Sequence, residues 1–258
     1  MHIISVLLSL YFQFIHRDTV QKTIQRGKMK KIINILVAAI CIFSLTLPVS
    51  AEEPKEIVQQ KNMTLDTNQN KNTELYFDNF VYRTDTIKNG AKIKHIKTCD
   101  SETYHVYDPD TGTLTDIISI EYLPQTTIKQ INPNAHTAFL TRDKIISSSS
   151  GKEIVRLRFT ASVMLYSSGS FRSFEAVNYS NLAVASSISS AHLENTSTAA
   201  YSHTGSFPCT QLDYSFTCNV VLTVSQSASI NAEIVSAGFS KNVNYYKYVY
   251  DSGSFTLY

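Results

Sequence analysis

The chain has 258 residues, of which 43% are hydrophobic, and carries 23 Lys and Arg against 21 Asp and Glu. A formal net charge of +2 is too small to indicate a basic patch for nucleic acid. It has no tryptophan but 15 tyrosines and 13 phenylalanines, and its length suffices for one sizeable domain.

An export signal begins at Met29. Two lysines are followed by the apolar run Ile32–Leu47 and by the small residues Val-Ser-Ala, which predicts a signal peptide over 29–51 with cleavage between Ala51 and Glu52. The apolar run of 16 residues is shorter than the roughly 20 that span a membrane. The leader resembles those of Gram-positive bacteria, so we expect a secreted protein at or near the cell envelope.

The segment before Met29 has no place in this scheme. We interpret residues 1–28 as an extension upstream of the natural start. Residues 1–51 contain six basic residues and one acidic residue, so the exported chain keeps 17 basic and 20 acidic residues and a net charge of −3. This charge argues further against a nucleic-acid partner. Residues 52–73 are polar and predict a disordered linker, which leaves 74–258 as the folded domain.

The first part of the domain alternates strand-like runs with turn signals. The runs on either side of Asn89-Gly90 predict a hairpin, because both turn positions favour positive φ. The run "ETYHVY" and the run "TLTDIISIEYL" flank the turn signal Asp108–Gly112, which predicts a second hairpin. Residues 132–145 contain the one candidate for a short helix before the longest strands.

Two later segments alternate with a period of two, which is typical of strands with one buried face. In the first, the inward residues are Val155, Leu157, Phe159, Ala161, Val163 and Leu165. The second runs from Val220 to Ile234, and its length of about 50 Å when extended predicts a bend near 226–229. The sequence therefore predicts an all-β, antiparallel β-sandwich in a single domain.

A short motif recurs three times: "YSSGSF" at 166–171, "YSHTGSF" at 201–207 and "YDSGSF" at 250–255. Each copy places glycine between a tyrosine and a phenylalanine. Because glycine is the usual residue at turns, we interpret all three as hairpin turns rather than as ligand-binding loops.

Three cysteines follow the predicted cleavage site: Cys99, Cys209 and Cys218. Export permits disulfides, and the spacing of the last two favours a hairpin-closing Cys209–Cys218 bridge worth about 2–3 kcal/mol. Cys99 would then be unpaired. The alternative is three free thiols.

No catalytic, cofactor-binding or metal-binding residue can be assigned. The histidines have no metal-ligand spacing; after the leader they are His95, His105, His136, His192 and His203. Asp108, Asp110 and Asp116 resemble a calcium loop, but Gly112 stands where an EF-hand needs an oxygen ligand. We interpret them as turn residues.

The region from Phe159 to Ser240 holds 26 serines and threonines among 82 residues and only five formal charges. Such strands fit the ordinary solvated face of an extracellular sheet, a lateral binding surface or the lumen side of a membrane β-barrel. Three hypotheses on function remain open. The first hypothesis is a non-enzymatic module that binds a surface glycan or protein, with tyrosines supplying stacking. The second is a membrane-active toxin that inserts β-strands, since alternating strands of about 9–11 residues can cross a bilayer. The third is an extracellular hydrolase assembled from distant residues.

Overall fold

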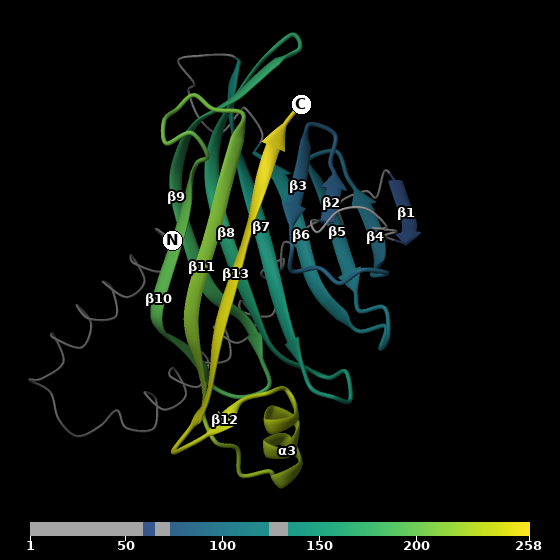
Figure 1. Cartoon of the computed structure of the whole chain (residues 1–258), viewed down its shortest axis with the longest axis vertical. Helices are drawn as coiled ribbons and strands as arrows, with labels where there is room; N and C mark the ends of the chain where they lie inside the picture. Colours follow the sequence, from purple (N-terminus) through teal and green to yellow (C-terminus); the bar gives the residue numbers. More distant parts are fainter. Residues whose placement is uncertain (1–58, 65–72, 124–133) are drawn as a thin grey trace, which may run out of the picture. The chain divides into compact units, whose positions relative to one another are not determined.

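The computed structural model describes residues 59–64, 73–123 and 134–258, all within the compact unit Lys55–Tyr258. These residues form antiparallel strands in two sheets, and α3 is the one helix among them (Figure 1). The all-β prediction is confirmed. The elements are β1 (Gln59–Thr64), β2 (Thr73–Tyr76), β3 (Phe80–Thr84), β4 (Lys92–Lys97), β5 (Ser101–Tyr107), β6 (Leu114–Tyr122), β7 (Ala135–Ser147), β8 (Glu153–Ser168), β9 (Phe171–Ser187), β10 (Ala191–Ser202), β11 (Gln211–Leu222), α3 (Ala228–Ser236), β12 (Ser240–Lys241) and β13 (Tyr245–Leu257).

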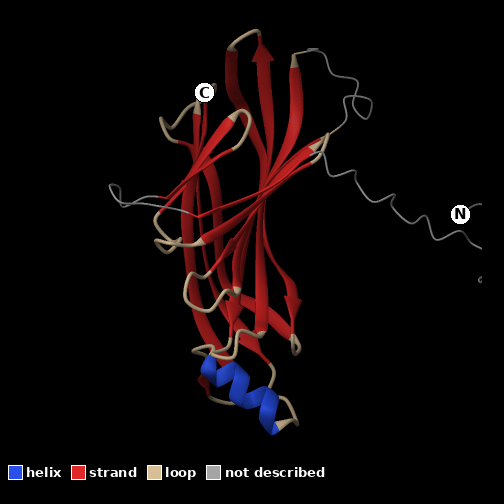
Figure 2. Cartoon of the chain, turned by 90° about the vertical axis from the view of Figure 1, so that its right-hand side faces the viewer, coloured by secondary structure: helices blue, strands red, loops and turns tan. Residues whose placement is uncertain are grey.

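The chain enters the second sheet twice. Sheet 1 has the order β1-β4-β5-β6-β7-β8-β9, in which β4 to β9 are neighbours in sequence as well as in space. Sheet 2 has the order β10-β11-β13-β3-β2, with β12 paired to β13. The chain thus leaves sheet 2 after β3 and returns to it at β10. Figure 2 shows α3 at the end of the strands opposite the C-terminus.

One hydrophobic cluster draws residues from both sheets. Phe159 on β8 stacks on Tyr214 of β11, with ring centroids 4.9 Å apart. Phe80 on β3 contacts Phe174 of β9 at 5.8 Å. Because these pairs join strands of different sheets, the two sheets share one core, and each keeps a second face directed away from it.

The alternation predicted for β8 is confirmed. Its six inward residues from Val155 to Leu165 are at most 3% exposed. The turn at Asp108–Gly112 is also confirmed, since it joins the paired strands β5 and β6. The Asn89-Gly90 hairpin is wrong: Gly90 has a φ of 77°, but β3 and β4 lie in different sheets, so this turn carries the chain from one sheet to the other.

Two of the three motif copies are turns, and the third is not. Gly169 and Gly205 have positive φ values of 61° and 80° and lie between paired strands. Gly253 instead lies within β13. A Cβ at this position would be 2.7 Å from the Arg83 carbonyl oxygen and 2.8 Å from Cε1 of Tyr214, so glycine serves a close approach rather than a turn.

The strand predicted from Val220 to Ile234 is wrong beyond Leu222, where β11 ends, and its second half is α3. Ile234 is fully buried and Ile230 packs against the core, four residues earlier on the same helical face. The side chain of Asn231 in α3 reaches back to Ser225, which precedes the helix. It accepts a hydrogen bond from the Ser225 N–H at 3.0 Å and donates one to the Ser225 carbonyl at 2.8 Å. The short helix proposed within 132–145 is also wrong, because residues 135–147 form the strand β7.

The predicted Cys209–Cys218 disulfide is wrong. Both side chains are buried free thiols, and Cys99 is an exposed one. The predicted hairpin does not exist, because residues 211–222 form a single strand. The extended chain from Gln211 to Cys218 alone spans roughly 23 Å, which keeps the Cys209 sulfur far beyond bonding reach of the Cys218 sulfur.

Most of the predicted leader and linker lies outside the described residues. Within the predicted linker 52–73, residues 59–64 form β1 at the edge of sheet 1, and Thr73 begins β2. The proposed extension 1–28, the signal peptide 29–51 and the cleavage site at Ala51 cannot be located on the fold. Among the described residues, no helix has the length and hydropathy needed to cross a membrane.

Candidate binding face on sheet 2

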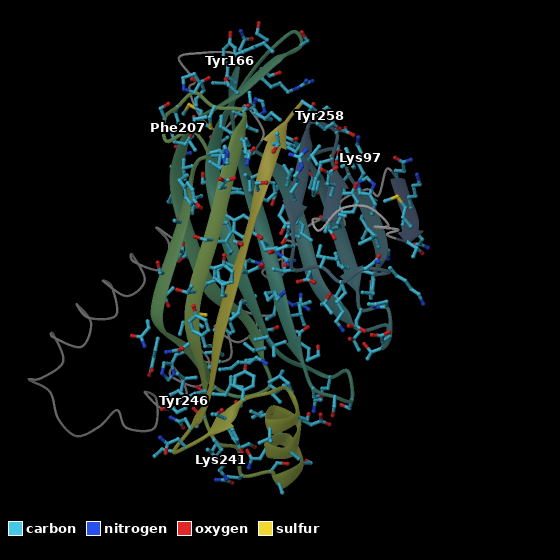
Figure 3. The ribbon with its side chains drawn as sticks, viewed as in Figure 1. Lys97, Tyr166, Phe207, Lys241, Tyr246 and Tyr258 are labelled. Atoms are coloured by element: carbon cyan, nitrogen blue, oxygen red, sulfur yellow. The ribbon has the colours of Figure 1, made fainter. Side chains whose placement is uncertain are left out.

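Three tyrosines follow one another along the outward side of β13. Tyr246, Tyr248 and Tyr250 occupy alternate positions, while the buried residues of β13 all lie on its other side: Tyr245, Val249, Asp251, Phe255 and Leu257. Side chains alternate between the two faces of a strand, so all three tyrosines share the face directed away from the core. Tyr248 and Tyr250 are the most exposed, at 65% and 53%. In Figure 3, Tyr246 marks the end of this series nearest β12.

The pairing of β13 with β11 and of β11 with β10 extends this series into a surface. It has four rows across the three strands, spaced roughly 6.8 Å apart. We call these twelve residues the tyrosine face: Tyr248, Asn219 and Glu194; Tyr250, Thr217 and Ser197; Ser252, Ser215 and Ala199; Ser254, Asp213 and Tyr201. All twelve are exposed or partly exposed. Aromatic rings therefore stand among hydroxyl and amide groups on one broad surface.

The strands that carry this face are fixed by their pairing with each other and by core contacts on their inward side. The β11–β13 ladder is unbroken from Gln211–Thr256 to Leu222–Tyr245. On the inward side of β11, Tyr214 and Phe216 both stack on Phe159. A face fixed in this way loses little backbone entropy when it binds a ligand, which favours affinity.

The carboxylates of the tyrosine face already have partners. Asp213 accepts one hydrogen bond from the side-chain amide of Gln211 at 2.9 Å and lies 2.7 Å from Nδ1 of His203. Glu194 lies 3.2 Å from Nε2 of His192. The twelve residues include no lysine or arginine. The face thus offers hydroxyl, amide and aromatic groups and suits an uncharged polar ligand better than an anionic one.

The buried charges between the sheets form a separate network. Arg142 on β7 is fully buried and binds Asp116 at 2.8 Å and Asp251 at 3.0 Å. Nearby, the hydroxyls of Tyr82 and Tyr214 are 2.7 Å apart, and burial raises the pKa of both phenols. Because none of these groups reaches solvent, we assign the network to structure rather than to chemistry.

The histidines were predicted to be ordinary surface or edge residues. His95 stacks on Tyr104 with centroids 4.3 Å apart, and burial lowers its pKa. His105 and His136 are partly buried, which lowers their pKa values as well. His192 and His203 lie at opposite ends of β10 and do not meet. Nδ1 of His203 lies 2.7 Å from Asp213 and 3.2 Å from the side-chain amide of Gln211, both on the neighbouring strand β11.

The three aspartates of the candidate calcium loop do not converge. Asp108 accepts hydrogen bonds from the N–H groups of Asp110 and Thr111, both at 3.0 Å, and lies 2.6 Å from Nζ of Lys88. Asp116 is on β6 and turns inward to Arg142. The turn interpretation of these residues accounts for their contacts.

Two cavities beside the described residues are respectively small and open. One of about 30 Å³ lies beside His136, Tyr166 and Arg172 and has room for about one water. Another of about 540 Å³ is an open groove beside β1, lined in part by Lys92 and Lys94. No carboxylate lines either of them. Neither of these two cavities is as strong a candidate as the tyrosine face.

The chain matches no protein-family model, no curated protein and no solved structure. Its function must therefore be inferred from its own surface. Sequence reasoning anticipated tyrosines and hydroxyl groups as a binding surface but did not single out Tyr248 or Tyr250. The signal was present as the alternation Tyr246, Tyr248, Tyr250 immediately before the third motif copy.

Proposed function

We propose that this chain is a secreted, non-enzymatic binding protein whose two sheets form a β-sandwich, and that the tyrosine face binds a neutral glycan at the cell envelope. The observation that carries the proposal is the position of Tyr248 and Tyr250, exposed on one face beside Asn219 and Thr217. A sugar ring has an apolar side that stacks on an aromatic ring and hydroxyl groups that bond to its polar neighbours.

The composition of the face supports a glycan over a charged partner. Hydroxyl and amide groups both donate and accept hydrogen bonds, as sugar hydroxyls do. The face lacks the arginines and lysines that phosphate or nucleic-acid binding requires. A polymer can also contact several rows at once, and linked weak contacts give a useful overall affinity.

Export supports the location. The segment 29–51 has the three parts of a signal peptide, and cleavage would leave Glu52 as the first residue. Expression in a Gram-positive host tests this: mass spectrometry should find the protein in the medium or cell-wall fraction with Glu52 at its N-terminus. Retention in the cytosol with residues 29–51 intact would refute export.

Binding is tested with insoluble polysaccharides, including purified peptidoglycan, chitin and cellulose. The double variant Tyr248→Ala/Tyr250→Ala should bind at least about tenfold more weakly, since each lost stack is worth about 1 kcal/mol. The matched control is Tyr179→Ala. Tyr179 is 51% exposed and lies in register with Ser162 on sheet 1, so its loss should leave binding unchanged. Equal losses in both variants would reject the tyrosine face.

A second candidate function rests on β9 and β10. From Asn178 to Tyr201, Leu182 is the one buried residue. The two strands have 17 and 12 residues, each longer than the about 9–11 needed to cross a bilayer. They belong to different sheets and are joined by a hydrogen bond from Thr198 to Ser180, so insertion would require both to leave their sheets and pair with each other.

Vesicle leakage distinguishes this second candidate. Release of an entrapped dye, together with lipid-dependent oligomers, would favour the membrane-active function. Intact vesicles at all protein concentrations would leave the glycan-binding function.

A further inference from the structure

Three segments that are distant in sequence are joined at the end of the strands opposite α3. The β10–β11 loop is bound to β9 by two hydrogen bonds between Phe174 and Cys209, at 2.7 and 3.0 Å. The same loop is bound to β13 by the Leu257 N–H, which donates to the Thr210 carbonyl at 2.8 Å. These bonds hold the loop beside the β8–β9 turn and the end of β13.

Each of these segments exposes a large aromatic side chain. Phe171 is 58% exposed, Phe207 39% and Tyr258 59%. Arg172, next to Phe171, donates to the Tyr258 carbonyl at 3.0 Å and so joins two of the segments directly. Figure 3 shows Phe207 and Tyr258 at this end, together with Tyr166, which contacts Phe171 at 6.1 Å. We call Phe171, Phe207 and Tyr258 the aromatic end.

Local hydrogen bonds shape the loop that presents Phe207. Residues 203–208 are all exposed, yet the loop is ordered by the Gly205 N–H, which donates to the Ser202 carbonyl at 3.0 Å. Gly205 has a φ of 80°, which only glycine adopts readily. Phe207 therefore remains exposed to water although the core lies close by. An exposed phenylalanine is stabilised when it contacts an apolar partner, so its exposure indicates an interaction site.

The surroundings of these rings match the headgroup region of a lipid bilayer. Residues 166–171 and 201–210 contain no Asp, Glu, Lys or Arg and are rich in serine and threonine, and the adjacent Arg172 is bound to the Tyr258 carbonyl. Aromatic rings concentrate at membrane interfaces, where one part is apolar and another part is hydrated. Without a basic cluster, such a surface does not depend on anionic lipids.

From this convergence we infer that the aromatic end binds the surface of a zwitterionic lipid bilayer. Phe171 and Phe207 enter the boundary between headgroups and acyl chains, while the serine and threonine hydroxyls bind the headgroups. The contact is superficial and leaves the strands paired, so it differs from strand insertion. It also leaves Tyr248 and Tyr250 free, so one molecule can hold a glycan and a membrane together.

Cosedimentation with phosphatidylcholine vesicles tests the inference. The purified protein should bind, and its partition coefficient should change by less than about twofold between 0.1 and 0.5 M NaCl, because the two loops that enter the bilayer surface carry no acidic or basic side chain other than His203. Phe171→Ser and Phe207→Ser should each lower the partition coefficient about tenfold, since each removes one aromatic side chain that the bilayer would bury. Tyr179→Ala is the matched control and should bind like the unaltered protein.

Three results would overturn the inference: no binding to phosphatidylcholine, equal binding by the two serine variants, or binding only to phosphatidylglycerol vesicles that high salt abolishes. Both serine substitutions lie on exposed side chains, and circular dichroism checks that the fold is kept. The outcome is separable from the glycan proposal, because Tyr248→Ala/Tyr250→Ala should still bind vesicles and Phe171→Ser/Phe207→Ser should still bind polysaccharide.

Discussion

Arg142 and Asp251 form an ion pair between the two sheets, with Nε 3.0 Å from Oδ2 and both side chains 0% exposed. Asp116 holds the same guanidinium from β6 at 2.8 Å. The cost of removing these charges from water is offset only while every partner is present. The network therefore ties β7 of sheet 1 to β13, the strand that carries Tyr248 and Tyr250.

Removing the arginine should destabilise the fold strongly. Arg142→Met leaves Asp116 and Asp251 buried without their cation, and we expect a loss of about 3–5 kcal/mol in the free energy of unfolding. Urea denaturation measures this change. Arg156→Met is the control: its partner Glu153 lies 2.6 Å away, but both side chains are partly exposed, so the loss should stay below about 1 kcal/mol. Equal losses would mean that the buried network contributes no more than a surface pair.

Gly253 should not tolerate a side chain. Alanine would place its Cβ 2.7 Å from the Arg83 carbonyl oxygen, a backbone atom that cannot move without shifting β3. We expect Gly253→Ala to cost about 1–3 kcal/mol in denaturation experiments. Ser254→Ala, one residue further along and on the outward face, should change stability by less than about 0.5 kcal/mol. A neutral Gly253→Ala would show that β13 and β3 do not approach so closely.

The thiols should react in two classes. Cys99 is exposed, whereas Cys209 and Cys218 are buried, and burial raises the pKa of the Cys218 thiol to about 11. Alkylation of the native protein should therefore label Cys99 quickly and the other two only after unfolding. Peptide mass spectrometry measures the labelling. A Cys209–Cys218 peptide cross-link in unreduced protein would contradict the fold of β11.

Acid should remove the stabilisation contributed by Asp108. The hydrogen bond from Lys88 is the main cause that holds the pKa of this carboxyl well below its usual range, and the hydrogen bonds from the N–H groups of the turn lower the pKa further. A carboxyl with a lowered folded-state pKa stabilises the protein above its unfolded pKa of about 3.9, and this contribution is lost as the pH falls through the folded-state pKa. Asp108→Asn should thus be less stable than the unaltered protein at pH 7, with a difference that shrinks below about pH 4. A difference independent of pH would show that the charge has no part.

The sequence predicted those elements whose local pattern has one interpretation. β8 alternates from Val155 to Leu165, and no helix would bury those residues together. From Ala228 onward the pattern was ambiguous, because Ile230 and Ile234 share a face at both strand and helix spacing. The hydrogen bonds between Asn231 and Ser225 form only once residues 225–231 have folded, so the sequence pattern could not reveal them.

Other features depend on partners that are distant in sequence. Nothing around Gly253 distinguishes it from Gly169, and only the approach of Arg83 and Tyr214 explains its strand conformation. The cysteine spacing indicated a hairpin because the length of β11 was not foreseen. Tyr248 and Tyr250 could have been found by alternation, but their neighbours Asn219 and Thr217 became visible only with the register of β11 and β13.

Chemical footprinting of tyrosines tests the central claim most directly. The protein is iodinated with and without the polysaccharide that it binds best, and peptide mass spectrometry measures the modification of each exposed tyrosine. We expect the bound polymer to protect Tyr248 and Tyr250 and to leave Tyr179 on sheet 1 unchanged. Protection of Tyr179 with unchanged modification of Tyr248 and Tyr250 would contradict glycan binding by the tyrosine face.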